Sequence, residues 1–291
     1  MFGNLFGPKK PAVVRTAPKA RKVNVAKRFT IVAETSQGSM SKVYKAVDNE
    51  NGRSVCLKLQ DMAKSSAAAG RASRVDRPSE GEIGTKIVHP HVVRTYEYGD
   101  TVKDEHYVVM EFVDGQSLNF IRQSRPMNLA SRLEMLAQAA EGLAAVHEAG
   151  FIHRDFGPKN LLVGREDFVK VIDFGLAVPD LPAFHRPGNR TGTLQYMAPE
   201  LIRREPTDAR LDVFSFAVTM FEFLTGKLPY DATDAMGMVR QRMNMDPMDP
   251  SLASPALPEP VCKLIRKLMA RKKDDRWARM ATVPAALREL I

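Results

Sequence analysis

The spacing of hydrophobic residues changes partway along the chain. In the first part, short apolar runs are separated by turn residues, a pattern that predicts strands of a small antiparallel sheet. The expected strands are residues 29–33, 43–48, 54–60, 92–98 and 106–113. Asn51-Gly52 is a strong hairpin signal between the second and third strands. Because side chains alternate along a strand, Cys56 and Lys58 are expected to share one face of the third.

The second part of the chain has helical periodicity. Between 128 and 149, apolar residues recur every three or four positions, which predicts a helix with one buried face. Residues 213–224 are apolar on nearly every side, so we expect a central buried helix that begins at Asp212. Further helices are expected at 118–123, 234–244, 260–271 and 280–290.

Positive charge is concentrated at the N-terminus. The net charge of the 291 residues is +9, but residues 1–28 hold eight Lys or Arg and no acid. The remainder therefore has 35 basic residues against 34 acidic ones. A nearly neutral body gives no indication of sequence-specific nucleic-acid binding, and the basicity belongs to the tail.

Two interpretations of the tail 1–28 remain open. Three prolines and little apolar periodicity predict an extended or disordered segment, which is consistent with a solvated leader. Alternatively, Phe2, Leu5 and Phe6 insert into a membrane interface while the basic residues make weak contacts with anionic lipid or an acidic partner. The chain has no apolar run long enough to cross a bilayer and no signal-peptide segment, so a cytoplasmic protein is expected. Its two cysteines form no disulfide framework.

A candidate catalytic loop lies between 152 and 163. Asp155 stands five residues before Asn160, with an apolar run on each side that would hold the ends of the loop in a core. Asp173 follows another short apolar run, 168–172. Phosphoryl transfer needs a group that orients the attacking hydroxyl and oxygen ligands for magnesium. Asp155 suits the first role, whereas Asn160 and Asp173 suit the second.

Three short motifs in this order carry a resemblance to a known family. They are His153-Arg154-Asp155 with Asn160, then Asp173-Phe174-Gly175, then Ala198-Pro199-Glu200. Together they resemble the signature set of eukaryotic-type (Hanks-type) protein kinases, and the resemblance covers about 29–291. It implies a bilobal α+β fold, in which an N-lobe (29–113) has a small antiparallel sheet and one helix and a C-lobe (114–291) is mainly helical. It also implies ATP and magnesium as cofactors and a protein as substrate.

The resemblance assigns roles to residues of the small lobe. Lys58 would contact the α and β phosphates, and Glu80, nine residues before His89-Pro90, would pair with it; Glu82 is the second candidate. The resemblance also implies residues around the nucleotide, which are Ser36, Gly38, Ser41 and Val43 in the phosphate loop and Cys56, Met110, Glu111 and Val113 around the adenine. Serines replace two glycines of this loop, which restricts the backbone or offers hydroxyls to a phosphate.

The catalytic loop departs from the family pattern at Gly157, where serine/threonine kinases usually have a lysine. Lys159 is the candidate to supply the missing charge, from a position where tyrosine kinases commonly carry arginine. The segment 192–196 resembles serine/threonine kinases, and we favour that specificity, with autophosphorylation included. The alternatives are a tyrosine or dual-specificity kinase and a pseudokinase scaffold.

Regulation and support of the large lobe are also implied by the resemblance. Arg154 would hold a phosphorylated activation segment, in which Thr193 is expected to contact the catalytic aspartate and Thr191 is the candidate regulatory site. Glu200 is expected to pair with Arg276. Asp212 is expected to cap its helix and to bind the backbone of the catalytic loop.

Overall fold

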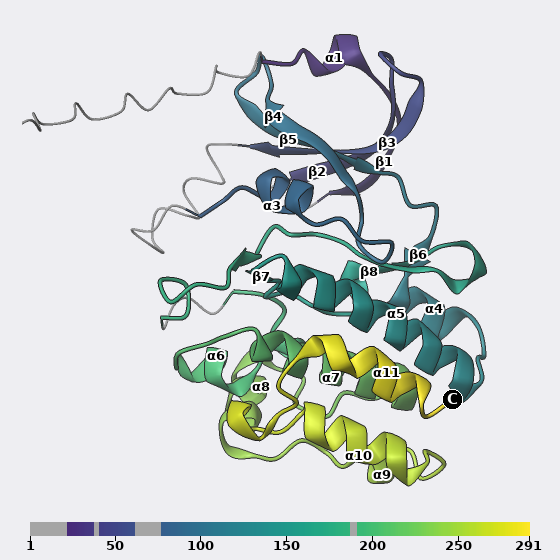
Figure 1. The fold of residues 1–291 in the computed structure, drawn as a ribbon, viewed down its shortest axis with the longest axis vertical. Helices are drawn as coiled ribbons and strands as arrows, with labels where there is room; N and C mark the ends of the chain where they lie inside the picture. Colours follow the sequence, from purple (N-terminus) through teal and green to yellow (C-terminus); the bar gives the residue numbers. More distant parts are fainter. Residues whose placement is uncertain (1–21, 38–40, 62–76, 187–190) are drawn as a thin grey trace, which may run out of the picture.

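The computed structural model describes residues 22–37, 41–61, 77–186 and 191–291, and it has two parts (Figure 1). The smaller part is a five-stranded antiparallel sheet in the order β1-β2-β3-β5-β4. Its strands are β1 (Phe29–Gln37), β2 (Ser41–Asp48), β3 (Arg53–Asp61), β4 (Thr95–Asp100) and β5 (Glu105–Glu111). Helix α3 (Glu80–Lys86) packs against β4. The fold is therefore α+β with a small antiparallel lobe, as the sequence predicts.

The first hairpin is longer than the hydrophobic pattern predicts. The pattern ends the first predicted strand at residue 33 and begins the second at 43, but β1 continues to Gln37 and β2 begins at Ser41. The pairing contains irregularities between Ile31 and Ala33 and between Glu34 and Ser36. Bulges of this kind let a strand continue after its inward and outward alternation is broken, which hides the strand from a period-two search. Gly38 of the predicted phosphate loop lies outside the described residues.

Residues 22–28, at the end of the predicted tail, pack against the small lobe. Val23 forms a bridge with Thr101, and residues Val25–Arg28 form the short helix α1, which is capped by the side chain of Asn24. Arg28 makes ion pairs with Asp48 and Glu97. Membrane contact through Phe2, Leu5 and Phe6 remains a hypothesis, because residues 1–21 lie outside the described part of the chain.

The larger part is built on two long helices. Helix α5 (Leu129–Glu148) begins where its periodicity starts, because the side chain of Asn128 accepts a hydrogen bond from Ser131 N. Helix α7 (Arg210–Thr225) is buried over nearly its whole length, as its apolar sequence predicts. The other helices are α4 (Leu118–Ser124), α6 (Pro199–Arg203), α8 (Ala235–Asn244), α9 (Pro250–Ala253), α10 (Glu259–Leu268) and α11 (Val283–Arg288).

Short strands hold the segments between the two parts. β8 (Leu161–Val163) pairs with β6 (Gln116–Ser117) and β9 (Val169–Val171), while β7 (Phe151–Ile152) pairs with β10 (Val178–Pro179). The loop 153–160 therefore leaves β7 and enters β8, with both ends in the core, as predicted. Within the described residues, no helix combines the length and the apolar sequence that a membrane crossing would require.

Candidate active site

Lys58 of β3 lies between two carboxylates from different parts of the chain. Its Nζ is 2.7 Å from Glu80 Oε1 of α3 and 3.0 Å from Asp173 Oδ1, which follows β9. Burial by itself lowers the pKa of the Lys58 ammonium, but the two carboxylates outweigh burial and raise it. Lys58 therefore stays protonated and joins the small lobe to the large one.

The structure selects Glu80 over Glu82 as the partner of Lys58. Ser79 caps the N-terminus of α3, so Glu80 is the first helical residue and faces the sheet, where it is buried. Glu82 lies on the outer side and pairs with Lys86 at 3.0 Å. The spacing argument from the sequence is correct for this pair.

Asp155 is held by both its carboxylate oxygens. Oδ1 accepts hydrogen bonds from Thr193 N and Thr193 Oγ1, each at 2.8 Å. Oδ2 lies 3.0 Å from Lys159 Nζ and 3.2 Å from Asn160 Nδ2. Asn160 Nδ2 also donates to the backbone carbonyl of Asp155 at 2.8 Å. The two polar residues predicted from the sequence are thus in direct contact, and Thr193 makes its predicted contact with the aspartate.

The backbone of this loop is fixed by Asp212. Its carboxylate accepts hydrogen bonds from His153 N at 2.7 Å and Arg154 N at 2.9 Å, as expected. Asp212 does not cap the helix, because α7 begins earlier and its N-cap is Ala209. A third partner is His147 Nε2 at 2.9 Å. Burial acts to raise the pKa of Asp212, but the hydrogen bonds outweigh burial and hold it below its ordinary value.

Gly157 faces the ring of Tyr196. A Cβ at Gly157 would lie 3.3 Å from that ring, so the position where the family usually has a lysine is close to an aromatic surface. The ring is held in place because Tyr196 Oη donates a hydrogen bond to Glu222 Oε2 at 2.6 Å. Lys159 Nζ lies 3.0 Å from Asp155 Oδ2, and the Lys159 side chain is about half exposed.

Donor atoms near Asp173 and Asn160 fit a magnesium ion. Both residues offer side-chain oxygens, the ligand type that magnesium prefers. The side-chain nitrogen of Asn160 donates a hydrogen bond to Asp155, so the side-chain oxygen of Asn160 is not engaged in that contact. The pKa of Asp173 is below its ordinary value, since Lys58 and Gly175 N outweigh the effect of burial, so the group is an anion. Among the described residues, no group of three or more His, Cys, Asp or Glu side chains is arranged to hold a metal ion.

The predicted adenine residues lie on neighbouring strands. Cys56 pairs with Met110 and Val55 with Glu111 across β3 and β5. Burial raises the pKa of the Cys56 thiol to about 11, so this cysteine is a neutral packing residue. Ser41 and Val43 are on β2, where Val43 is directly opposite Lys58.

The remaining predicted residues are placed less completely. Val113 follows β5 and is partly buried against the core, while Ser36 is near the end of β1. The side chain of Glu111 is paired with Lys170 at 3.0 Å. Their contact with a nucleotide stays a prediction.

Gly192 belongs to the activation segment, between Gly175 and Ala198, and packs against the backbone of the catalytic loop. Gly192 has φ +116°, and a Cβ there would lie 2.7 Å from the carbonyl oxygen of Arg154, so glycine is required. Thr191 immediately precedes it and is partly exposed. Arg154 itself has positive φ and a substantially buried side chain, and burial lowers the pKa of its guanidinium. Regulation through Thr191 and Arg154 stays a prediction.

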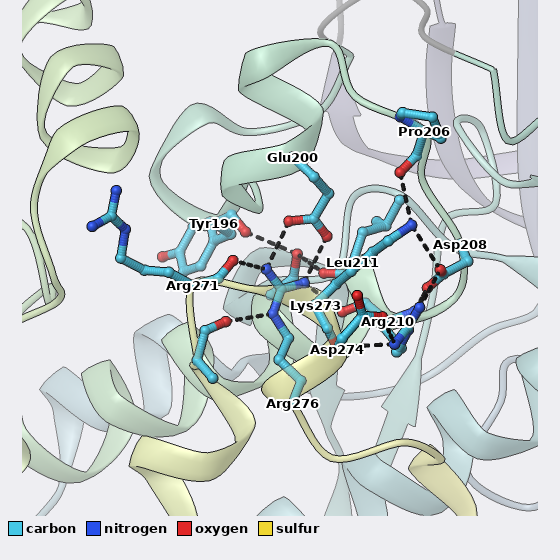
Figure 2. Close-up of polar contacts among 12 residues, drawn as sticks. Tyr196, Glu200, Pro206, Asp208, Arg210, Leu211, Arg271, Lys273, Asp274 and Arg276 are labelled. Atoms are coloured by element: carbon cyan, nitrogen blue, oxygen red, sulfur yellow. Dashed lines mark hydrogen bonds and ion pairs between the residues drawn. The ribbon is translucent and has the colours of Figure 1, made fainter.

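The expected pair between Glu200 and Arg276 is present (Figure 2). The two guanidinium nitrogens of Arg276 are 2.6 and 2.7 Å from the two oxygens of Glu200, and both side chains are buried. Arg276 also donates to the backbone carbonyls of Ala270, Arg210 and Arg271. This pair ties the segment after the activation loop to the start of α7 and to the region that follows α10.

Sequence reasoning missed three kinds of contact. Gln60 Nε2 donates to Glu80 Oε2 at 2.6 Å, and the signal for it was that residues 58 and 60 share a strand face. A Cβ at Gly81 or Gly84 of α3 would overlap a β4 side chain, a close approach that no local pattern in the sequence indicates. His147 lies in the last turn of α5, and no local pattern in the sequence indicates its contact with Asp212.

The comparisons with known proteins agree with this geometry. Residues 29–286 match the family model described as a protein kinase domain. The chain is 31% identical over 253 residues to the probable serine/threonine-protein kinase pknA2 of Bifidobacterium longum, covering 86% of this chain and 33% of that protein. It is 33% identical over 256 residues to the serine/threonine-protein kinase pkn2 of Myxococcus xanthus (85% and 30%) and 30% identical over 258 residues to PknB of Mycobacterium leprae (86% and 41%). The chain thus spans less than half the length of these curated relatives.

Proposed function

The chain belongs to the protein kinase family, and from this premise we propose that it transfers the γ-phosphate of ATP to serine and threonine hydroxyls of proteins. The observation that carries the proposal is the position of Lys58 between Glu80 and Asp173. A buried ammonium needs anions around it, and this one is held where a nucleotide phosphate could share it. The pair also requires that α3 be seated against the sheet.

Asp155 is the residue that we assign to the hydroxyl of the substrate. Its Oδ1 already accepts a hydrogen bond from the hydroxyl of Thr193 at 2.8 Å, so the geometry for accepting one from an alcohol is present. Asn160 and Lys159 hold the other side of the carboxylate. A base positioned in this way contributes about a hundredfold to ten-thousandfold to the rate.

Asn160 and Asp173 are the residues that would hold magnesium. When bound, the ion would neutralise charge on the phosphates. Lys58 would bind the α and β phosphates, and Glu80 would orient Lys58. Backbone groups near Met110, Glu111 and Val113 would bind the adenine.

Serine and threonine specificity is supported by two observations. The Thr193 contact with Asp155 belongs to the segment 192–196 that resembles serine/threonine kinases. The relatives described above carry serine/threonine-protein kinase in their names. A basic residue at position 159, here Lys159 beside Asp155, is the feature in common with tyrosine kinases, which commonly carry arginine there. It is the reason for an experiment that identifies the phosphorylated residue.

The test is transfer from labelled ATP with magnesium, followed by phosphoamino-acid analysis. We expect phosphoserine and phosphothreonine from the purified chain, including autophosphorylation, and almost no label from Asp155→Asn. Nucleotide binding should persist in that variant, since Asp155 does not contact Lys58. Equal labelling by the wild type and Asp155→Asn would refute the catalytic assignment. ATP binding without any transfer would favour a pseudokinase scaffold, for which the replacement at Gly157 is the motivating observation.

Regulation through the activation segment belongs to the same proposal. Phosphate on Thr191 would lie on the same segment as Gly192, which packs against the backbone of Arg154. We expect mass spectrometry of the active protein to find phosphate on Thr191 and Thr191→Ala to lower activity. Full activity of that variant, with no phosphate found on Thr191 of the wild type, would remove this residue from the mechanism.

A further inference from the structure

Glu80 has a second partner besides Lys58. Its Oε1 accepts a hydrogen bond from Lys58, while its Oε2 accepts one from Gln60 Nε2 at 2.6 Å. Lys58 and Gln60 are two residues apart on β3, so both side chains point from the sheet toward α3. The carboxylate is therefore held at both oxygens by donors from one strand.

Glu80 is buried, so its second hydrogen-bond donor is not easily replaced. The residue is 7% exposed, and water therefore has little access to an oxygen that loses its protein donor. Burial and the nearby Asp173 carboxylate act to raise the pKa of Glu80, whereas hydrogen bonds from Lys58 and Gln60 act in the opposite direction. A buried carboxylate oxygen without a donor is strongly disfavoured compared with one that is hydrogen-bonded.

We propose that Gln60 is a positioning residue of the active site, which fixes the carboxylate of Glu80 so that Lys58 is held between Glu80 and Asp173. Gln60 acts through Glu80 and does not touch the phosphates. The effect on catalysis rests on the proposed kinase function, whereas the effect on Lys58 does not. Two kinds of measurement can therefore separate the two ideas.

The first measurement follows the Lys58 amine without nucleotide. The full chain is treated with acetic anhydride, and acetylation of Lys58 is followed by peptide mass spectrometry. Gln60→Leu removes the donor at similar volume, and we expect Lys58 to be acetylated several-fold faster in it because the ammonium is less firmly paired. Glu80→Gln should have the same effect. Glu82→Gln is the matched control, since Glu82 pairs with Lys86 on the outer side of the same helix, and it should label like the wild type.

The second measurement is steady-state kinetics with ATP. A hydrogen bond to a charged group corresponds to about tenfold to hundredfold in an equilibrium. We expect Gln60→Leu to raise the KM for ATP by about tenfold, with a small change in the KM for a protein substrate. The urea midpoint should fall modestly, because one oxygen of the buried Glu80 carboxylate loses its donor. Gln60→Glu, which places a like charge beside Glu80, should be worse.

The outcomes are separable. Labelling of Lys58 at the wild-type rate in Gln60→Leu overturns the proposal, whatever the kinetics. Faster labelling in a protein that transfers no phosphate supports the positioning role while refuting the kinase function. A fall in the urea midpoint of Gln60→Leu that matches the loss of activity, with unchanged labelling, would show that Gln60 only stabilises the fold.

Discussion

Gly84→Ala tests whether α3 must be glycine-rich to reach the sheet. In an isolated helix this change stabilises by about 1 kcal/mol, because alanine has the better helix propensity. In the structure, a Cβ at Gly84 would overlap the hydroxyl oxygen of Thr95 on β4 and lie 3.1 Å from its Cβ. Thr95 is buried, so α3 and β4 must move apart to accept the methyl group.

The two effects have opposite signs, and their sizes decide the result. Overpacking of a tight contact costs about 1–3 kcal/mol, which exceeds the gain of about 1 kcal/mol from propensity. We expect Gly84→Ala to lower the free energy of unfolding by about 1 kcal/mol. Since Glu80 is on the same short helix, the displacement should also weaken its pair with Lys58 and reduce phosphate transfer.

Urea unfolding of four proteins measures this directly: the wild type, Gly84→Ala, Thr95→Ala and the double variant. Thr95→Ala removes the overlapping hydroxyl, so the double variant should recover part of the stability lost by Gly84→Ala. An increase in stability for Gly84→Ala alone, close to the gain expected from propensity, would refute the close-packing argument. Additive effects in the double variant would show that the Thr95 hydroxyl is not the obstacle.

Three other predictions concern charged groups. Lys159→Met should reduce phosphate transfer while leaving ATP binding unchanged, because Lys159 contacts Asp155 and not Lys58. Kinetics and nucleotide titration measure the two effects, and unchanged transfer would exclude Lys159 as the replacement for the lysine that the family usually has at position 157. Arg276→Lys should destabilise the protein by about 3 kcal/mol in urea, since it leaves the buried Glu200 without its two-point partner, and a loss below about 1 kcal/mol would contradict this. The folded-state pKa of Asp212 is depressed, so its contribution to stability is present above the unfolded pKa and is lost as pH falls through the folded pKa. Asp212→Asn should therefore flatten the dependence of unfolding free energy on pH below about pH 4. An unchanged acid slope would count against a depressed pKa of Asp212.

Features that depend on local pattern were predictable from the sequence. The third strand, the long helix at 128–149 and the polar residues of the catalytic loop were placed correctly, because each is marked by spacing within a few residues. Glu80 was also found, through the spacing to a histidine-proline pair that the family resemblance implies. These signals are short-range, so they survive without knowledge of packing.

Features that depend on contact between distant segments were not predictable in the same way. Glycine is a poor helix former, yet the two glycines of α3 are what lets the helix approach β4. The role of Gln60 depends on its contact with Glu80 of α3, and the pattern of residues around Gln60 in its strand does not by itself indicate that contact. The long first hairpin was hidden because its bulges interrupt the alternation.

Arg28 neutralises two acidic side chains of the small lobe. Its guanidinium is 2.6 Å from Glu97 Oε1 and 3.1 Å from Asp48 Oδ2, and Asp48 is almost fully buried at the end of β2. A shortened protein that started at Phe29, where the kinase homology begins, would leave these two acids close together without a cation. Trimming the chain for expression should therefore keep Arg28, because it supplies the positive charge that Asp48 and Glu97 share.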